Sequence, residues 1–183
     1  MISLYLAMVD TDEKRDKVTF IYENFYSFMA YTAGQVLNGN KANTEDAVHN
    51  AMMTVIENLD LIDFSDLRKA KHLCGIIAKN KAKDMCKAKE SQALSLDDEQ
   101  FENLAGDDPI EKLIQKDTYN LILKEMRAMS DTYRDVLFLK YVHEMKEREI
   151  ALILNLPPKT VNVRIFRGRQ LLKNAIRKEV LYV

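Results

Sequence analysis

The sequence predicts an all-α protein made of two small helical domains. The chain has only 5 Gly and 3 Pro in 183 residues, fewer than a turn-rich β protein needs. Leu, Ala, Lys, Glu and Met, which favour helices, are abundant. Because 47% of the residues are hydrophobic, the chain could bury one sizeable core or two small ones, and the number of domains has to be argued from the pattern.

The net charge excludes a uniformly cationic protein that coats nucleic acid, since 27 basic residues stand against 28 acidic ones. No uncharged stretch approaches the roughly 20 residues needed to span a bilayer, and the first residues lack a basic leader and a cleavage site. We therefore expect a cytoplasmic protein.

Residues with catalytic or metal-binding chemistry are sparse. Cys74 and Cys86 match neither a zinc pair nor a disulfide framework. The three histidines lie far apart, without an acid or thiol at ligand spacing. The sequence thus predicts no metal, no cofactor, no small-molecule substrate and no enzymatic activity.

Three helices are expected in the first half of the chain. Residues 18–37 are apolar at helical intervals and rich in aromatic side chains. After a Gly-Asn turn, Asn43 or Thr44 can cap a second helix, which should end near Leu59. A third, basic helix should begin at Lys69 or shortly after it.

The second and third helices differ sharply in charge. Residues 42–67 contain six acidic residues and no Lys or Arg, whereas residues 68–89 contain eight basic residues and one acid. Helical spacing gathers six side chains in one sector of the basic helix: His72, Ile76, Lys79, Asn80, Lys83 and Lys87. A lysine-rich face toward water is the simpler alternative, but a second basic helix in the same chain favours contact with nucleic acid.

A linker divides the chain. Residues 91–113 are acidic, contain Gly106 and Pro109 and lack a sustained apolar period, so they indicate a linker between domains at 1–90 and 114–183, with a solvated loop as the alternative. The C-terminal part should hold four helices, the first of them over 110–129, and Ser130 or Asp131 should cap the second.

The stretch "NLPPKT" predicts a sharp break between the last two helices. Asn155 stands where a helix closes with a left-handed residue, and Pro157 cannot continue that helix. Pro158 suits the first turn of the next helix, because an N–H there would be unpaired anyway.

The last helix should have one apolar and one mainly cationic side. Its apolar side collects Val161, Ile165, Gly168, Leu172 and Ile176. Its opposite side collects Lys159, Val163, Phe166, Arg167, Gln170 and Arg177. Apolar side chains among cations suit the DNA major groove, which offers phosphates, guanines and thymine methyls, so we predict a DNA-reading helix-turn-helix. The alternative is an ordinary amphipathic hairpin with a basic surface, and burial of Val163 and Phe166 in the interior would favour it.

Three stretches resemble a known family: "TEDAVHNAMMTVIENL", "HLCGIIAKNKAKDMCKAK" and, most strongly, "MSDTYRDVLFLKYVHEMKEREIALILNLPPKTVNVRIFRGRQLLK". Together they resemble the bacterial RNA polymerase sigma factors of the sigma-70 family, in particular the small extracytoplasmic-function (ECF) group with only regions 2 and 4. The resemblance extends over about residues 18–178. One departure concerns region 2, where Ile56 and Leu73 stand at positions that the family usually fills with tryptophan.

The resemblance implies a dissociable subunit of RNA polymerase that directs promoter-specific initiation. Region 2 would bind the β′ clamp helices through Asp46, His49, Asn50 and Met53. It would contact the −10 element through the six residues of the basic helix named above. Region 4 would dock on the β flap and bind the −35 element through Lys159, Thr160, Asn162, Val163, Arg164, Phe166 and Arg167. The acidic linker resembles family linkers that thread the RNA exit path, and an anti-sigma factor is a further partner that the family suggests.

Two other classes of function compete with this interpretation. A dimeric helix-turn-helix regulator would read a palindrome without joining the polymerase, and it would need a self-association surface. A DNA-processing enzyme such as a recombinase would need a nucleophile with an arginine or carboxylate cluster in the first half, which the sequence lacks.

Overall fold

The computed structural model describes residues 2–91 and 116–181, and all regular structure in these two ranges is helical. The chain divides into two compact units, Met1–Leu96 and Asp97–Val183. The all-α prediction is confirmed. Apart from Ser91, the predicted linker lies outside the described residues, so its boundaries stay a prediction.

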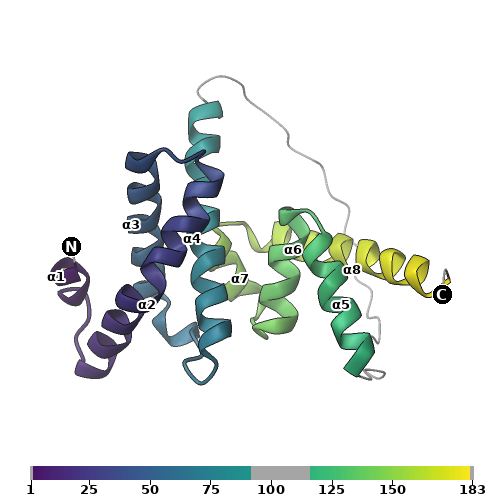
Figure 1. The fold of residues 1–183 in the computed structure, drawn as a ribbon, viewed down its shortest axis with the longest axis horizontal. Helices are drawn as coiled ribbons and strands as arrows, with labels where there is room; N and C mark the ends of the chain where they lie inside the picture. Colours follow the sequence, from purple (N-terminus) through teal and green to yellow (C-terminus); the bar gives the residue numbers. More distant parts are fainter. Residues whose placement is uncertain (1, 92–115, 182–183) are drawn as a thin grey trace. The chain divides into compact units, whose positions relative to one another are not determined.

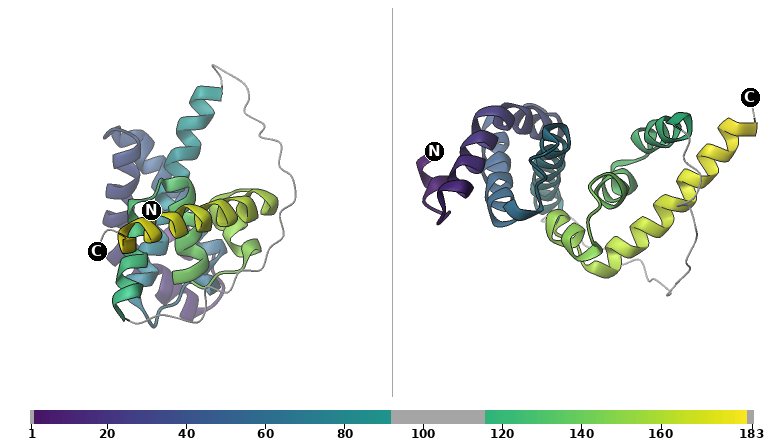
Figure 2. Two further views of the ribbon diagram at one scale, coloured as in Figure 1. Left: turned by 90° about the vertical axis from the view of Figure 1, so that its right-hand side faces the viewer. Right: turned by 90° about the horizontal axis from the view of Figure 1, so that it is seen from below.

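The first unit is built around one central helix. Its elements are α1 (Ile2–Leu6), α2 (Asp12–Val36), α3 (Lys41–Glu57), the 3₁₀ turn η1 (Leu59–Leu61) and α4 (Leu67–Ser91). Helix α4 packs against both α2 and α3, which also contact each other, and the three run side by side (Figures 1 and 2). Most of their buried side chains are aliphatic, so the unit has one apolar core.

A glycine allows α2 and α4 to approach closely. A Cβ atom at Gly75 of α4 would lie 2.6 Å from Cε1 of Phe28 on α2, closer than two such atoms can pack. The aromatic ring therefore occupies the space that a side chain would need. Tyr31, another aromatic residue of α2, is 67% exposed.

The helices of this unit begin at residues other than those predicted. Helix α2 begins at Asp12 rather than Val18, because the Thr11 side chain accepts a hydrogen bond from the N–H of Lys14 at 3.3 Å. The cap of α3 is Asn40, whose Oδ1 accepts from the N–H of Asn43 at 3.1 Å. The predicted cap therefore lies inside the first turn of α3.

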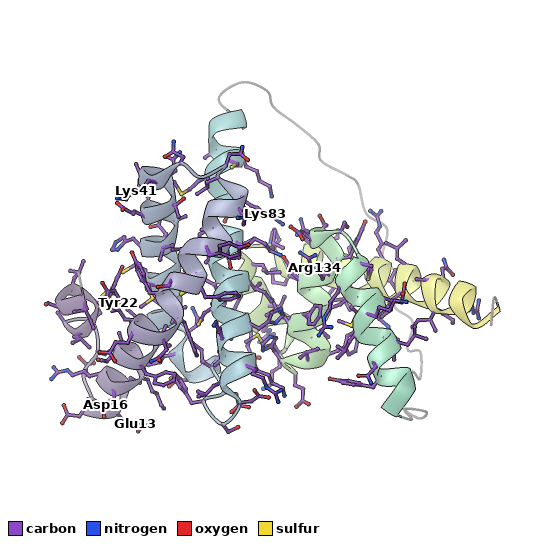
Figure 3. All side chains as sticks on the ribbon, in the orientation of Figure 1. Glu13, Asp16, Tyr22, Lys41, Lys83 and Arg134 are labelled. Atoms are coloured by element: carbon purple, nitrogen blue, oxygen red, sulfur yellow. The ribbon has the colours of Figure 1, made fainter. Side chains whose placement is uncertain are left out.

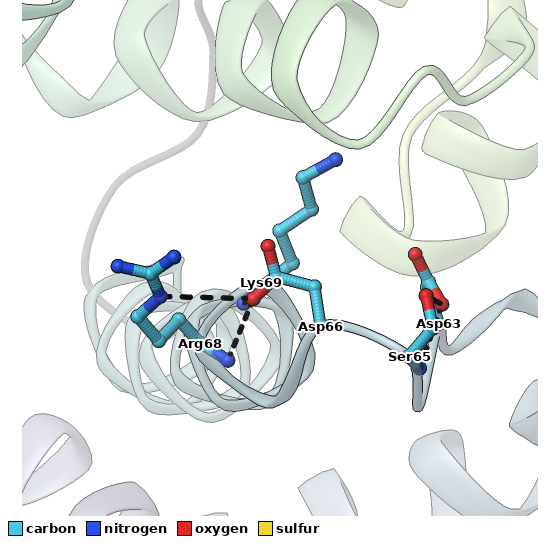
Figure 4. A network of polar contacts seen from close by, with 5 residues as sticks. All are labelled: Asp63, Ser65, Asp66, Arg68 and Lys69. Carbon is cyan, nitrogen blue, oxygen red and sulfur yellow. Dashed lines mark hydrogen bonds and ion pairs between the residues drawn. The ribbon is translucent and has the colours of Figure 1, made fainter.

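Asp66 fixes the start of α4, as Figure 4 shows. Its Oδ1 accepts from the N–H groups of Arg68 at 3.0 Å and Lys69 at 3.2 Å, which satisfies two donors of the first turn. In the preceding loop, the Asp63 carboxylate accepts from the backbone N–H and the hydroxyl of Ser65, and these bonds lower the pKa of Asp63. The basic helix thus starts two residues before the predicted Lys69.

The second unit packs three helical segments onto one long helix. Its elements are α5 (Lys116–Ala128), α6 (Asp131–Leu137), the π-helical turn η2 (Phe138–Val142), α7 (Glu147–Leu154) and α8 (Pro158–Leu181). Helix α8 contacts α5, α6 and α7 (Figure 2). Ser130 occupies the predicted cap position of α6, without a side-chain capping bond. None of the helices that the structure describes is long and apolar enough to cross a membrane.

Candidate nucleic-acid interface

The break between α7 and α8 has the predicted form. Asn155 is left-handed, with φ 50° and ψ 50°. The N–H of Leu156 donates to the carbonyl of Ala151 at 3.0 Å, which closes α7 in the manner of a Schellman motif. Pro158 is the first residue of α8. The two helices and this short turn form a helix-turn-helix.

Helix α8 buries one side against its neighbours. The buried residues on that side are Val161, Ile165, Gly168 and Leu172, and Ile176 is half-buried. A Cβ at Gly168 would lie 3.1 Å from Cδ1 of Leu137 on α6, so the absence of a side chain lets α8 lie close to α6. The apolar side of the predicted helix is therefore its packing side.

The opposite side of α8 is accessible. Its exposed residues are Lys159, Asn162, Arg167, Gln170 and Arg177, and its half-buried residues include Thr160, Val163 and Phe166. Neither Val163 nor Phe166 belongs to the core. Burial of these two side chains in the interior would have favoured an ordinary amphipathic hairpin, and the structure does not show it. The side keeps the mixture of cationic, polar and apolar groups that a DNA groove can accommodate.

Arg164 differs from the other predicted contacts of α8 because it flanks the packing side. It is half-buried, and this burial lowers the pKa of its guanidinium, while the nearby Tyr133 of α6 acts in the opposite direction. Arg167, one turn further along the helix, is exposed. Arg164 is therefore less accessible to a partner than Arg167.

The start of α7 is held by charged side chains. Nζ of Lys140 on η2 lies 2.7 Å from Oε1 of Glu147, and this bond lowers the pKa of Glu147. The Glu149 carboxylate accepts from the backbone N–H of Lys146 at 2.7 Å. Carboxylates in the first turn also suit the positive end of the helix dipole. The first helix of the helix-turn-helix thus has a fixed beginning.

On α4, five of the six predicted DNA contacts keep accessible surface. His72 and Lys87 are exposed, and the half-buried members are Lys79, Asn80 and Lys83. Lys83 lies in the C-terminal half of α4 (Figure 3).

Ile76 departs from the prediction, since it is only 4% exposed. All residues from Leu73 to Ala78 are buried, because α4 is covered by α2 on one side and by α3 on another. The prediction assumed a helix buried along one stripe, whereas the middle of α4 is buried all round.

The predicted polymerase-binding residues share one face of α3. Asp46 and Asn50 are exposed, and His49 and Met53 are half-buried. Their spacing of three and four residues forms a stripe. The residues between them face the core: Ala47, Val48, Ala51 and Met52. We call Asp46, His49, Asn50 and Met53 the α3 stripe.

Sequence reasoning missed Tyr5 of α1. Its side chain is 0% exposed, and its hydroxyl oxygen lies 3.0 Å from Nδ1 of His49 in the α3 stripe. The available signal was the spacing of Tyr5 and Val9, which lie four residues apart in a short apolar run and are both buried.

The two positions where the family usually has tryptophan belong to the core. Ile56 is 8% exposed and Leu73 is 1% exposed. Among the described residues, no group of His, Cys, Asp and Glu could hold a metal ion. Cys74 is buried, which raises the pKa of its thiol to about 12 and makes it a poor nucleophile.

Two comparisons with known proteins agree on the family. Residues 119–172 match the family described as "Sigma-70, region 4". A curated relative, the ECF RNA polymerase sigma factor SigW of Bacillus subtilis (strain 168), is 30% identical over 149 residues. That alignment covers 76% of this chain and 78% of the relative.

Proposed function

The chain belongs to the extracytoplasmic-function group of sigma-70 factors, which gives it a role in transcription initiation, and we propose that it binds core RNA polymerase and directs it to promoters through the −10 and −35 elements. The observation that carries the proposal is the helix-turn-helix of α7 and α8, in which one side of α8 is packed and the other is cationic and accessible. A cytoplasmic location follows from these partners.

The proposal assigns the −35 element to α8. In a helix-turn-helix the second helix enters the major groove, with residues near its N-terminus at the base edges. Lys159 and Asn162 lie in the first turns of α8 and are exposed, and Arg167 follows on the accessible side. Arginine can pair with guanine through two hydrogen bonds, and Val163 and Phe166 can contact thymine methyls.

The proposal assigns the −10 element to α4 and leaves out Ile76, because that side chain is buried. The residues assigned to it are His72, Lys79, Asn80, Lys83 and Lys87. Lysine side chains suit phosphate contacts, which give affinity but little sequence information. We therefore expect α4 to follow the DNA backbone, while α8 reads bases.

Core polymerase would bring the two contacts together by holding both units, the first through the α3 stripe and the second on its β flap. Two modest DNA contacts held on one complex reinforce each other through effective concentration, so neither needs to be strong alone. If about six phosphates are neutralised, log affinity should fall against log salt with a slope near −5.

Promoter-directed transcription with purified core polymerase tests the proposal. The full chain should restore initiation at promoters of its own bacterium, identified from transcripts that increase after its overexpression. Arg167→Ala should lower promoter use while leaving core binding intact. Asn50→Arg, which alters the α3 stripe at an exposed position, should lower core binding.

The competing function predicts a different result. If the chain does not support initiation but binds a palindromic duplex as a free dimer in gel filtration, it is an independent regulator and the proposal is wrong. A monomer with weak unaided DNA binding that initiates with core polymerase supports the proposal.

A further inference from the structure

Helix α1 makes a polar contact with the α3 stripe. The Tyr5 hydroxyl lies 3.0 Å from Nδ1 of His49, and the two rings stack with centroids 5.7 Å apart at 29°. The ring centroids of Tyr5 and Tyr22 on α2 lie 6.1 Å apart. Figure 3 labels Tyr22 on α2. The phenol of Tyr5 is therefore held between two helices, with its polar end at His49.

The buried phenol stays protonated. Burial, followed by the nearby Tyr26 and Tyr22, raises the pKa of Tyr5 to about 12. A neutral phenol can donate its proton to Nδ1, and a neutral imidazole that accepts at Nδ1 carries its own proton on Nε2. With Tyr5 as the donor in this contact, Nε2 of His49 carries the ring proton and can donate to a partner.

His49 lies among residues that are accessible to a partner. Asp46 and Asn50, one turn before it and one residue after it, are exposed, whereas Tyr5 is fully buried. A macromolecule that docks on α3 could touch the edge of His49 but not Tyr5. Tyr5 can therefore affect binding only through the orientation and tautomer of His49.

We propose that Tyr5 is a positioning residue for polymerase binding, which orients His49 and fixes its proton on Nε2 so that this N–H can donate to an acceptor on the polymerase. The inference rests on the proposed function, because it takes the α3 stripe as the polymerase-binding surface. It makes α1, a helix that the sequence did not predict, part of the construction of that surface.

The test uses Tyr5→Phe in the full chain, because phenylalanine keeps the buried ring and removes only the hydroxyl. Tyr22→Phe is the matched control, since it removes a hydroxyl from the same cluster that does not bond His49. Because His49 would no longer be held ready to donate to the polymerase, binding to core polymerase should weaken about 3- to 10-fold in Tyr5→Phe, the equivalent of one hydrogen bond. Tyr22→Phe should bind like the unchanged chain. Binding is measured well below the melting temperature of both variants, because Tyr5→Phe also loses the stability that one intramolecular hydrogen bond contributes.

Two further measurements separate positioning from stability. The side-chain nitrogen signals of His49 should show the Nε2–H tautomer in the unchanged chain and a mixture in Tyr5→Phe. In a His49→Ala background, the added Tyr5→Phe change should cause no further loss of binding, because the residue through which it acts is gone.

Each outcome has a distinct meaning. If Tyr5→Phe binds core polymerase normally, loses as much as Tyr22→Phe, or adds its full effect to His49→Ala, the positioning role is wrong while the proposed function stands. If the unchanged chain itself does not bind core polymerase, the proposed function fails and this inference with it.

Discussion

The two long basic helices differ in how many of their sides are buried. Helix α4 has 25 residues and α8 has 24, and both carry cations along their length. Helix α8 is packed along one side, which leaves the other side accessible from Lys159 to Arg177. Helix α4 lies between α2 and α3, so its middle is buried all round and its accessible cations lie in two separate groups, before Leu73 and beyond Ala78. The number of neighbours, rather than composition, decides which surface a basic helix can offer to DNA.

The largest expected effect comes from the middle of α4. Leu73→Ala removes a side chain that is 1% exposed and should lower the free energy of unfolding by about 2–5 kcal/mol, through lost burial and the cavity left behind. Leu171→Ala on α8 is the matched control, because Leu171 is 48% exposed, and it should change stability by less than about 0.5 kcal/mol. Urea denaturation of the full chain, with hydrogen exchange to locate the loss, checks both values.

Equal losses of stability in Leu73→Ala and Leu171→Ala would contradict this difference in burial between α4 and α8. They would mean that α8 is covered on the side where Leu171 lies, and the accessible side of α8 would then be narrower than described.

The next effect concerns the proposed contact of α8 with bases. Arg167→Ala should weaken promoter binding by the polymerase complex by about 1–3 kcal/mol and relax the preference at one base pair of the −35 element. Arg177→Ala, an exposed arginine ten residues further along the same helix, should weaken binding less and equally for all sequences. Binding measured on single-base promoter variants distinguishes the two. If both substitutions weaken binding equally for all promoter variants, Arg167 contacts a phosphate rather than a base.

The turn before α8 could be predicted because its chemistry is local. Asn155 tolerates the left-handed conformation, and Pro158 fits a first turn, whatever surrounds them. The caps of α3 and α4 were harder to locate. Several residues before α3 can cap a helix, and the structure uses Asn40 where Asn43 and Thr44 were expected. Asp66 caps α4 although the basic pattern begins after it.

The sequence pattern could not predict contacts between segments that lie far apart along the chain. Burial of Ile76 depends on α2 and α3, which cover α4. Helical periodicity within α4 carries no information about these two neighbours. The contact of Tyr5 with His49 joins residues 44 positions apart. Periodicity placed the α3 stripe on one face, but it gave no indication that α1 packs against it.

A smaller effect is expected at the helix ends that use asparagine. Asn155→Ala should destabilise the second unit by about 1–2 kcal/mol, because alanine is disfavoured in the left-handed region, whereas Asn155→Gly should be neutral or slightly stabilising. Asn38, with φ 52° after α2, is the counterpart in the first unit.

Substitutions at Asn155 and Asn38 distinguish an effect on stability from an effect on DNA binding. Asn155→Ala should also weaken −35 binding, since it alters the turn that sets α7 against α8. Asn38→Ala should lower only the stability of the first unit, measured by urea denaturation and hydrogen exchange. If both substitutions affect promoter binding equally, the turn has no special role in presenting α8.

The smallest effect concerns pH and the ion pair at the start of α7. The bond with Lys140 lowers the pKa of Glu147 below its ordinary value of 4.5, so the carboxylate contributes stability that is fully present above that value and is lost as the pH falls through the folded pKa. Because the Glu147 side chain is 43% exposed, the contribution should be about 0.5 kcal/mol or less. Urea denaturation between about pH 5 and pH 3 should therefore show a slightly steeper loss in the unchanged chain than in Glu147→Gln. Lys140→Met should behave like Glu147→Gln, since either change removes the ion pair.

A pH profile shared by all three proteins would show that the ion pair does not stabilise the start of α7. The packing of α7 on α8 would then be what holds the first helix of the helix-turn-helix.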